Sequence, residues 1–231
     1  MRHNFILICI FGLINSYSYP EIVRDEIVYE NNFESNNLKN ISGGGISFFN
    51  ETNVLGDFNN DGFTLHIDDV SKHEYVFVSF DLYIHGSWDG NFNGFTQGDK
   101  ADKWILEYKP NMDLFNNNDF DKFITTFSNS PCYPNYCLRQ SYPDTYPNEN
   151  NPTTGFFEKN LSKKCNSNFF GGKTTLYKLE KVFKSSGNAI VLRFYDELYQ
   201  PNAIDKDGIS QQKCDESWSL DNLTVRVIDY K

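Results

Sequence analysis

Acidic and amide side chains gather in three glycine-containing stretches of this sequence. The three groups are Asp57, Asn59, Asn60 and Asp61, then Asp81, Asp89, Asn91, Asp99 and Asp102, and last Asp205, Asp207, Asp215, Glu216 and Asp221. Oxygen donors on loops are the ligands that calcium takes, roughly six to eight at a time. Asp and Asn also cap tight turns without any metal. Calcium binding and turn formation are therefore two interpretations of each group.

Sequence signatures of known catalytic centres are missing. There is no GxSxG, HExxH or ExDxE pattern. His66, His73 and His85 occur singly, which favours exposed or hydrogen-bonded histidines over catalytic bases. A glycosidase needs two carboxyl groups roughly 5–10 Å apart, and Glu216 with Asp89 is the pair that would supply them. We therefore expect no catalysis, with a secreted glycoside hydrolase as an alternative.

Aromatic and polar side chains on two segments favour recognition of a ligand. Aromatic planes and paired hydrogen-bonding groups are what binding of sugars or peptides needs. The aromatic and polar side chains of 81–91 lie on a predicted strand and in the loop that follows it. The side chains of Arg193 and Tyr195 alternate with apolar residues on another predicted strand. The predicted binding residues are Asp81, Tyr83, His85, Trp88, Asp89, Asn91, Arg193 and Tyr195.

Alternation of apolar and polar residues predicts an all-β protein. Over 74–85, one face carries the predicted core residues Val76, Val78, Phe80, Leu82 and Ile84. The opposite face is expected to be half exposed. Other strands are predicted at 45–49, 62–67, 103–109, 123–127, 176–183, 189–195 and 219–228. Short strands without helices between them favour an antiparallel β-sandwich.

The first 18 residues resemble a secretory signal. Arg2 and His3 form a basic start, and an apolar run over 5–14 is too short to cross a bilayer as a helix. Ser16 and Ser18 supply the small residues of a cleavage site. No later segment is long and apolar enough for a membrane helix. We therefore expect a secreted, extracellular protein whose mature chain, 19–231, is one domain.

The charge balance excludes one class of partner. There are 21 Lys and Arg against 31 Asp and Glu, and the formal net charge is −10. Nucleic acids and anionic membranes attract proteins with a basic face. Nucleic acid is therefore not an expected partner.

Four cysteines lie outside the signal segment, an even number that suits disulfides in an oxidising compartment. Pro134 and Asn135 suit a tight turn that would bring Cys132 and Cys137 together. That leaves Cys165 to pair with Cys214. A zinc site is the weaker alternative, because there is no CxxC pair and no nearby His. The Asn- and Pro-rich stretch 129–168 is predicted to be one long loop held by these cysteines.

Asn-x-Ser/Thr triplets would permit glycosylation of a secreted protein. The asparagines are Asn40, Asn50, Asn160 and Asn222. Such triplets are frequent by chance in a chain this rich in Asn, so they permit a glycoprotein without establishing one.

Several stretches resemble a group of secreted, mostly uncharacterised jelly-roll domains of the galactose-binding-like or MAM-like kind. The residues that carry the resemblance are VSFDLYIHGSWDGN (78–91), DKWILEY (102–108), FSN (127–129), QSYP (140–143), NPTTG (151–155), LRFYDEL (192–198) and DESWSLDNLTV (215–225), with NNFES (31–35) at the start. The resemblance covers about 31–228. It implies a jelly-roll fold, an extracellular recognition role and a structural calcium ion near Glu34 and Asp221.

The calcium expectation also has a physical basis. The first and last strands of a sandwich often lie side by side, so carboxylates at Glu34, near the first expected strand, and Asp221, in the last, would meet. Two unpaired carboxylates repel each other, and a divalent ion removes that conflict. The alternative is an exposed Glu34 with Asp221 bonded to backbone N–H groups. The sequence thus predicts a secreted module that binds a glycan or protein, with a hydrolase or a passive coat or matrix component as alternatives.

Overall fold

The computed structural model describes residues 20–92, 100–110, 120–165, 172–200, 203–204 and 207–231. The predicted signal segment 1–18 lies outside them. One sheet has the order β3 (Ile46–Phe49), β4 (Thr52–Phe58), β12 (Glu216–Tyr230), β6 (Tyr75–Gly86), β10 (Thr174–Lys184), β9 (Glu158–Leu161), with β1 (Ile22–Asn31) also paired to β12. The other has the order β2 (Ile41–Ser42), β5 (Gly62–Ile67), β11 (Ile190–Glu197), β7 (Lys103–Lys109), β8 (Asp121–Thr126).

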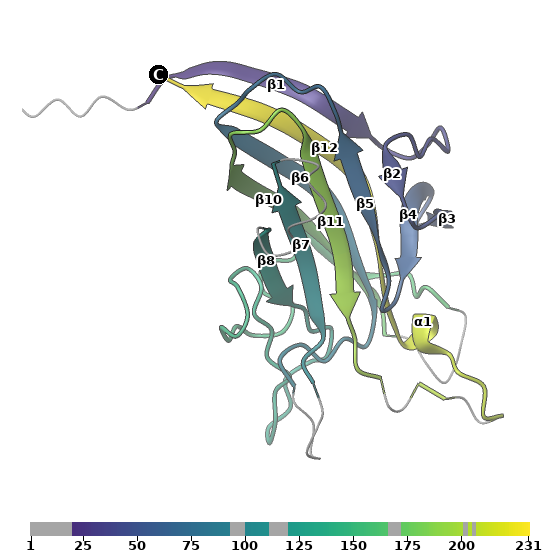
Figure 1. Ribbon diagram of the computed structural model, residues 1–231. Helices are drawn as coiled ribbons and strands as arrows, with labels where there is room; N and C mark the ends of the chain where they lie inside the picture. The colour runs from purple at the N-terminus through teal and green to yellow at the C-terminus, as the bar shows by residue number, and fades with distance from the viewer. Residues whose placement is uncertain (1–19, 93–99, 111–119, 166–171, 201–202, 205–206) are drawn as a thin grey trace, which may run out of the picture.

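The seven-stranded and five-stranded sheets pack face to face as a sandwich (Figure 1). All of the strand pairs between these elements are antiparallel. The antiparallel β-sandwich predicted from the alternation is thereby confirmed. A short helix, α1 (Gln212–Asp215), precedes β12. Within the described ranges, no helix has the length and apolar character needed to cross a membrane.

Aromatic side chains from both sheets fill the space between them. The five predicted core positions of β6 are all buried: Val76, Val78, Phe80, Leu82 and Ile84. Trp104 of β7 is fully buried, and its ring centroid lies 5.6 Å from Phe80 and 5.8 Å from Trp218 in the facing sheet. Because burying one large apolar side chain contributes roughly 1.5–3 kcal/mol, contacts of this kind hold the two sheets together.

Four strands, β1, β2, β4 and β9, are present that the alternation did not predict. β1 pairs with β12 alone and exposes Ile22, Val23 and Ile27, so no apolar face marks it in the sequence. β9 lies inside the predicted loop 129–168. Glu34, expected at the start of the first strand, follows β1 and lies in the turn after it.

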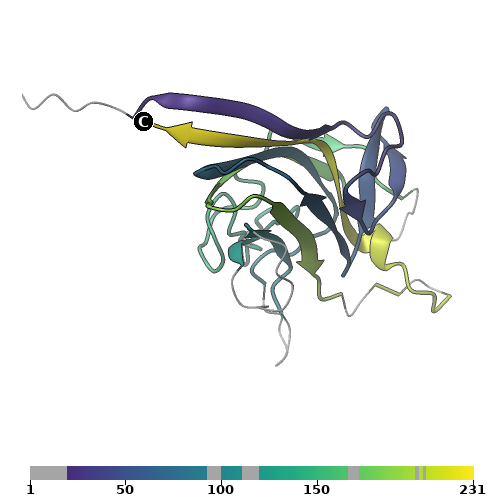
Figure 2. The same ribbon diagram turned by 45° about the horizontal axis from the view of Figure 1, so that its top comes forward.

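β1 and β12 form a ribbon that extends beyond the sandwich (Figure 2). The two strands pair from Ile22 opposite Tyr230 to Asn31 opposite Leu223. Backbone hydrogen bonds also join Glu21 with Lys231 at 3.4 and 2.9 Å. The segments 87–92, 127–157, 198–200, 203–204 and 207–215 gather at the opposite end of the molecule, which we call the loop end (Figure 1).

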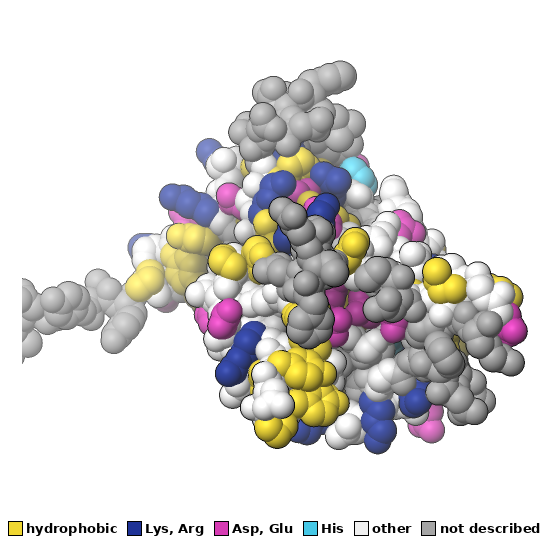
Figure 3. All heavy atoms as spheres, turned by 90° about the horizontal axis from the view of Figure 1, so that it is seen from below, with side chains coloured by type: hydrophobic (Ala, Val, Ile, Leu, Met, Phe, Trp, Pro, Cys, Tyr) yellow, Lys and Arg dark blue, Asp and Glu magenta, His cyan; other side chains and the backbone are white. Residues whose placement is uncertain are grey.

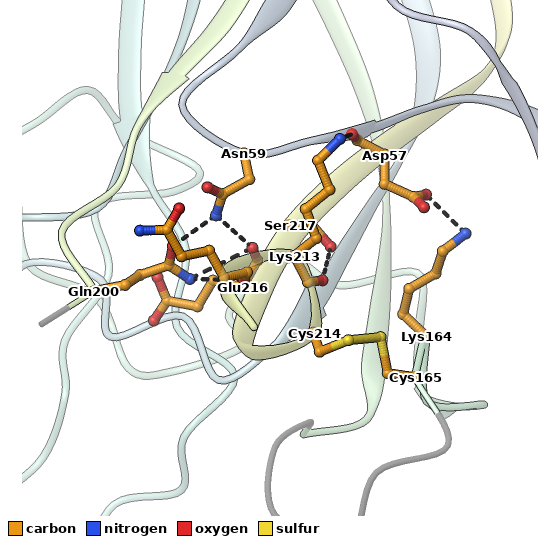
Figure 4. The surroundings of a disulfide bond; sticks show 10 residues. Asp57, Asn59, Lys164, Cys165, Gln200, Lys213, Cys214, Glu216 and Ser217 are labelled. Atoms are coloured by element: carbon orange, nitrogen blue, oxygen red, sulfur yellow. Dashed lines mark hydrogen bonds and ion pairs between the residues drawn. A yellow bond between two sulfur atoms is a disulfide. The ribbon is translucent and has the colours of Figure 1, made fainter. Parts of the chain in front are cut away.

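Both predicted disulfides are present. Cys132–Cys137 closes a hairpin in the long loop. Cys165–Cys214 joins the segment after β9 to α1, with the two Cα atoms 5.4 Å apart (Figure 4). Beside it, Lys164 pairs with the Asp57 carboxylate at 2.7 Å. The second disulfide therefore ties α1 and the start of β12 to the outer side of the seven-stranded sheet.

Loss of the two disulfides should destabilise the protein unequally. They span sequence separations of 49 and 5 residues. Loop-closure entropy then predicts losses of about 4 kcal/mol for Cys165→Ser with Cys214→Ser and about 2 kcal/mol for Cys132→Ser with Cys137→Ser. Denaturant unfolding of both double variants measures this. Equal losses would contradict the loop-length argument.

Candidate functional site

The structure divides the predicted binding residues between the two outer faces of the sandwich. Asp81, Tyr83 and His85 point outward from β6 in the seven-stranded sheet, whereas Arg193 and Tyr195 point outward from β11 in the five-stranded sheet. The residues that alternate with them form the core between the sheets. The single surface expected from the sequence is therefore not formed.

The outer face of β6 is covered over 81–85, which corrects the expectation of a half-exposed face there, whereas Phe77 and Ser79 are half-buried as expected. Tyr83 is 5 % exposed and His85 is 1 % exposed. Phe49 of β3 packs edge-on against both rings, at centroid distances of 5.4 and 4.6 Å. Leu161 and Leu176 complete a second apolar cluster around Tyr83. These side chains pack against one another and offer little surface to a ligand.

His85 is held as a neutral imidazole. Its Nδ1 lies 2.9 Å from the Thr174 hydroxyl and its Nε2 lies 2.7 Å from the Ser219 hydroxyl. Burial, and next the positive charge of Lys164, lower the pKa of His85 well below its usual value of 6.5.

Trp88 and Asn91 hold the loop after β6 in place. Trp88 is fully buried, and its Nε1–H donates to the Ser217 carbonyl at 3.1 Å. The Asn91 side-chain oxygen accepts hydrogen bonds from the Thr126 and Ser141 hydroxyls at 2.5 and 2.8 Å. In these positions both side chains have a structural role.

Arg193 and Tyr195 are fixed by Glu107, a residue that the sequence analysis did not select. Glu107 on β7 accepts hydrogen bonds from Arg193 and the Tyr195 hydroxyl, each at 2.9 Å, and pairs with Lys122 at 2.6 Å. A carboxylate as buried as this one needs such partners. Glu107 lies opposite Arg193 in the β7–β11 register, which no local pattern reveals. Arg193 and Tyr195 line a pocket of about 280 Å³.

Glu34 and Asp221, the predicted calcium ligands, come together around one hydroxyl group. Thr52 Oγ1 lies 2.5 Å from Glu34 Oε1 and 3.2 Å from Asp221 Oδ2. Backbone N–H groups of Asn53 and Asn222 donate to the two carboxylates at 2.9 and 2.7 Å. Two carboxylates and a hydroxyl oxygen are donors that suit calcium, although the N–H contacts are also those of the turn interpretation. Calcium binding therefore stays a prediction.

A third carboxylate lies beside this pair. Asp81 faces Asp221 across the β6–β12 pair and is ion-paired with Lys178 at 3.1 Å. Burial, together with the charges of Asp81 and Glu34, raises the pKa of Asp221 to about 6. A cation near Asp221 would relieve this repulsion.

The acidic and amide residues at 57–61 lie at the end of β4 and in the turn that leads to β5. The backbone N–H groups of Asn60 and Asp61 donate to the Asp196 carboxylate at 2.6 and 3.3 Å, and Asn60 adopts a φ of 49°. Asp99 and Asp205 of the other groups lie outside the described residues. In the parts of the chain with described coordinates, no three His, Cys, Asp or Glu side chains are placed to hold one metal ion as they stand.

A polar groove lies where the long loop meets β9 and β10. Its volume is about 710 Å³, within the range of roughly 300–1,000 Å³ typical of ligand sites, whereas the Arg193 pocket falls below it. The lining residues are Asn129, Ser130, Pro131, Cys132, Asn151, Pro152, Thr153, Lys159, Asn160, Lys173 and Thr175. Amide, hydroxyl and ammonium groups thus face a space large enough for a small ligand.

Buried amides make the walls of this groove rigid. Gln140 is fully buried; its Oε1 accepts from the Ser128 and Thr153 N–H groups at 3.1 and 2.8 Å. Its Nε2 donates to two further backbone carbonyls at 3.0 Å. Asn129 Nδ2 donates to the Ile84 and Gly86 carbonyls at 3.0 and 2.9 Å, which ties the loop to the end of β6.

Aromatic side chains are exposed on the segments that form the groove. Tyr133 and Tyr136, inside the disulfide-closed hairpin, are stacked at 5.1 Å and about half exposed. Phe156 lies under Lys159, 4.8 Å from the ammonium nitrogen, and Phe157 is 61 % exposed. Figure 3, which looks at the loop end, shows hydrophobic side chains gathered on its surface. The sequence signal for this surface is the density of Tyr, Phe and Asn within 129–160.

The four predicted glycosylation sites are exposed residues with a positive φ, between 50° and 69°: Asn40, Asn50, Asn160 and Asn222. Asn40 and Asn50 lie in turns, whereas Asn160 and Asn222 lie within β9 and β12, where the register of the strand pairing shifts. Asn222 Nδ2 donates to Asp81 at 2.9 Å, and Asn160 lines the groove. Asparagine tolerates this backbone region better than most residues, so the local backbone accounts for all four. Glycosylation stays a prediction.

No protein-family profile and no curated protein sequence matches this chain. Comparison with solved structures finds weakly similar chains, among them the K2 cleaved adhesin domain of Lys-gingipain. That alignment covers 87 % of this chain and 97 % of the other, with a TM-score of 0.36 and 12 % identity. A similarity this low carries no argument about ligand or family, so the galactose-binding-like or MAM-like relationship stays a prediction.

The buried His85 should make stability depend on pH. Because its folded-state pKa lies well below 6.5, the unfolded chain takes up a proton below about pH 6.5 that the folded protein excludes, and acid then favours unfolding. The free energy of unfolding should therefore fall between about pH 7 and pH 5 by more in the wild type than in His85→Gln. Urea unfolding at both pH values measures the difference. An identical pH dependence in the two proteins would show that His85 is not held neutral.

Proposed function

We propose that this protein is an extracellular recognition module that binds a glycan in the groove at 129–175. The observation that carries the proposal is the groove itself, about 710 Å³ in volume and lined by amide, hydroxyl and lysine groups. Sugars present many hydroxyl groups and one apolar face, so they match convergent polar groups beside aromatic rings. The disulfides, and the signal-like first segment, support an extracellular location.

The lysines favour a glycan that carries carboxylate or sulfate groups. Lys159 and Lys173 are both exposed, and neither is ion-paired within the described residues. In a chain with a net charge of −10, two such lysines form a local positive site that would attract an acidic ligand.

Binding should be tested on arrays that pair neutral glycans with acidic ones. We expect an acidic glycan to bind, and Lys173→Ala and Lys159→Ala each to weaken binding at least about tenfold, which is ~1.4 kcal/mol. Lys184→Ala is the matched control. Lys184 is an exposed lysine at the end of β10, whereas Lys173 directly precedes the start of that strand. Tyr136→Ala should weaken binding further if its ring stacks on the sugar. Binding that survives both groove substitutions would exclude this site.

The asparagine in the groove provides a second check. A glycan on Asn160 would occupy the space in which the ligand is proposed to bind. Ser162→Ala removes the triplet and leaves Asn160 in the groove, so this variant should bind as well as the wild type or more tightly in protein made by a glycosylating host. Weaker binding by Ser162→Ala, with the fold intact, would argue against a groove that must be open.

We further propose that a structural calcium ion joins the turn after β1 to β12. Glu34 and Asp221 would supply carboxylate oxygens, and Thr52 a hydroxyl oxygen. Carbonyl oxygens and water would complete the coordination. The raised pKa of Asp221 supports the proposal, since an uncompensated charge there opposes folding above about pH 6.

Thermal melts with calcium and with EDTA test this ion. The melting temperature of the wild type should rise with calcium, because the ion binds the folded state alone. Asp221→Asn should melt no lower than the wild type in EDTA, since it removes a buried charge, and should lose the calcium response that depends on this site. A calcium response in Asp221→Asn equal to that of the wild type would leave turn formation as the role of these residues.

A further inference from the structure

Glu216, the first residue of β12, carries a buried carboxyl oxygen without a hydrogen-bond partner. The residue is 4 % exposed, and its Oε2 contacts no donor. The backbone of Glu216 is well held, because its carbonyl accepts from Asn59 Nδ2 at 2.7 Å (Figure 4). A buried carboxylate without a partner costs several times the free energy of an ordinary lost hydrogen bond.

Three more carboxyl groups lie near Glu216: Asp215 precedes it in the sequence, whereas Asp89 and Asp102 come from distant segments. The charges of Asp102, Asp89 and Asp215 all act on it. Asp102 is 2 % exposed and accepts backbone N–H groups of Asp89 and Tyr199 at 3.0 and 3.1 Å. We call Asp89, Asp102, Asp215 and Glu216 the acidic cluster. The loop after β6, the start of β7 and the end of α1 thus meet at one point of the loop end.

Within the described residues, no lysine or arginine forms an ion pair with any of the four members of the acidic cluster; Lys213 of α1 donates instead to the Asp57 carbonyl at 2.7 Å. Asp196, a fifth acid nearby, is satisfied by the Trp218 indole N–H and two backbone N–H groups. Burial and mutual repulsion raise the pKa values of Asp89, to about 6, and of Glu216. The cluster therefore favours the binding of a proton or a cation.

We propose that the acidic cluster binds a calcium ion through Glu216 and its neighbouring carboxylates. Asp102 and Glu216 lie at the buried bottom, while Asp89 and Asp215 are half exposed and provide the way in from solvent. Figure 3 shows acidic side chains near the middle of the loop end. No three of these carboxylates converge as they stand, so two of them bind the ion and carbonyl oxygens and water fill the other positions, which calcium accepts.

The surrounding backbone holds the members of the acidic cluster in place. Ser87 N–H donates to the Asp215 carbonyl at 2.9 Å, and the Ser87 hydroxyl donates to the Asp215 carboxylate at 2.9 Å. Gly86, with a φ of 85°, lies so close to Asp215 that an added Cβ would stand 1.8 Å from its carbonyl oxygen. Cys214, one residue before Asp215, is fixed by its disulfide. These contacts fix the backbone on which Asp215 and Glu216 stand.

Calcium binding by the full mature chain tests the proposal. Titration calorimetry of the wild type should find a calcium site. Glu216→Gln, and Asp89→Asn at the partly exposed edge of the cluster, should each abolish calcium binding at this site or weaken its affinity at least about 30-fold. Asp221→Asn should leave the affinity of this site unchanged. Terbium, which replaces calcium, should luminesce when the tryptophans are excited, because Trp88 bonds to Ser217, the residue after Glu216. Glu149→Gln, an exposed acid of the same loop end, is the matched control and should bind as the wild type does.

The outcomes separate this site from the one at Glu34. Two ions per chain, one lost with Glu216→Gln and the other with Asp221→Asn, support both proposals; one ion lost only with Glu216→Gln supports the acidic cluster alone. Binding unaffected by Glu216→Gln and Asp89→Asn would overturn the proposal. The proposal would also be overturned if the wild type did not bind calcium and its free energy of unfolding rose at low pH through protonation of the acidic cluster. Protons alone would then neutralise the cluster. Far-UV circular dichroism of each variant shows whether it has folded.

Discussion

The antiparallel pairing of β12 with β6 is the constraint on which the other features depend. β12 spans 15 residues and also pairs with β1 and β4. Its register with β6 places Asp221 opposite Asp81 and Glu216 opposite Gly86. Because side chains alternate along a strand, a shift by one residue would exchange the core and surface faces of β12. The same pairing that buries Leu220 and Trp218 therefore also decides which carboxyl groups meet: Asp221 with Asp81 within the pair, and Glu216 with its acidic neighbours where the pair begins.

This arrangement concentrates negative charge along one strand. Asp221 and Glu216 both lie on β12, both are almost fully buried, and each has acidic neighbours from other segments. Elsewhere the sandwich compensates its buried acids with internal partners, as Arg193, Lys122 and Tyr195 do for Glu107. The contrast shows that the fold is able to supply counterions. Among the described residues, no lysine or arginine is paired with Asp221 or Glu216, although Lys178 pairs with Asp81 beside Asp221.

Much of the fold could be predicted from the sequence, because alternation over β6 and the short strands around it is a local signal. The core face of β6 was predicted for that reason, and the disulfide pairing from a turn at Pro134 and Asn135 that left one pair of cysteines over. The exposure of Tyr83 and His85 was predicted wrongly, because whether an outward-facing residue is exposed depends on what covers it. Phe49, which covers Tyr83 and His85, is distant in sequence. Likewise Thr52 between Glu34 and Asp221, and Glu107 beneath Arg193, depend on strand register, which a single sequence does not encode locally.

The pairing of Glu21 with Lys231 has a mechanical consequence. These two residues are hydrogen-bonded at the tip of the ribbon that β1 and β12 form (Figure 2). A force that pulls Glu21 and Lys231 apart acts across the ladder rather than along it, so it loads one pair of hydrogen bonds at a time. Under such a force β1 would separate from β12 pair by pair, at low force. The loop end, at the far side of the sandwich, would keep its structure while these two strands separate.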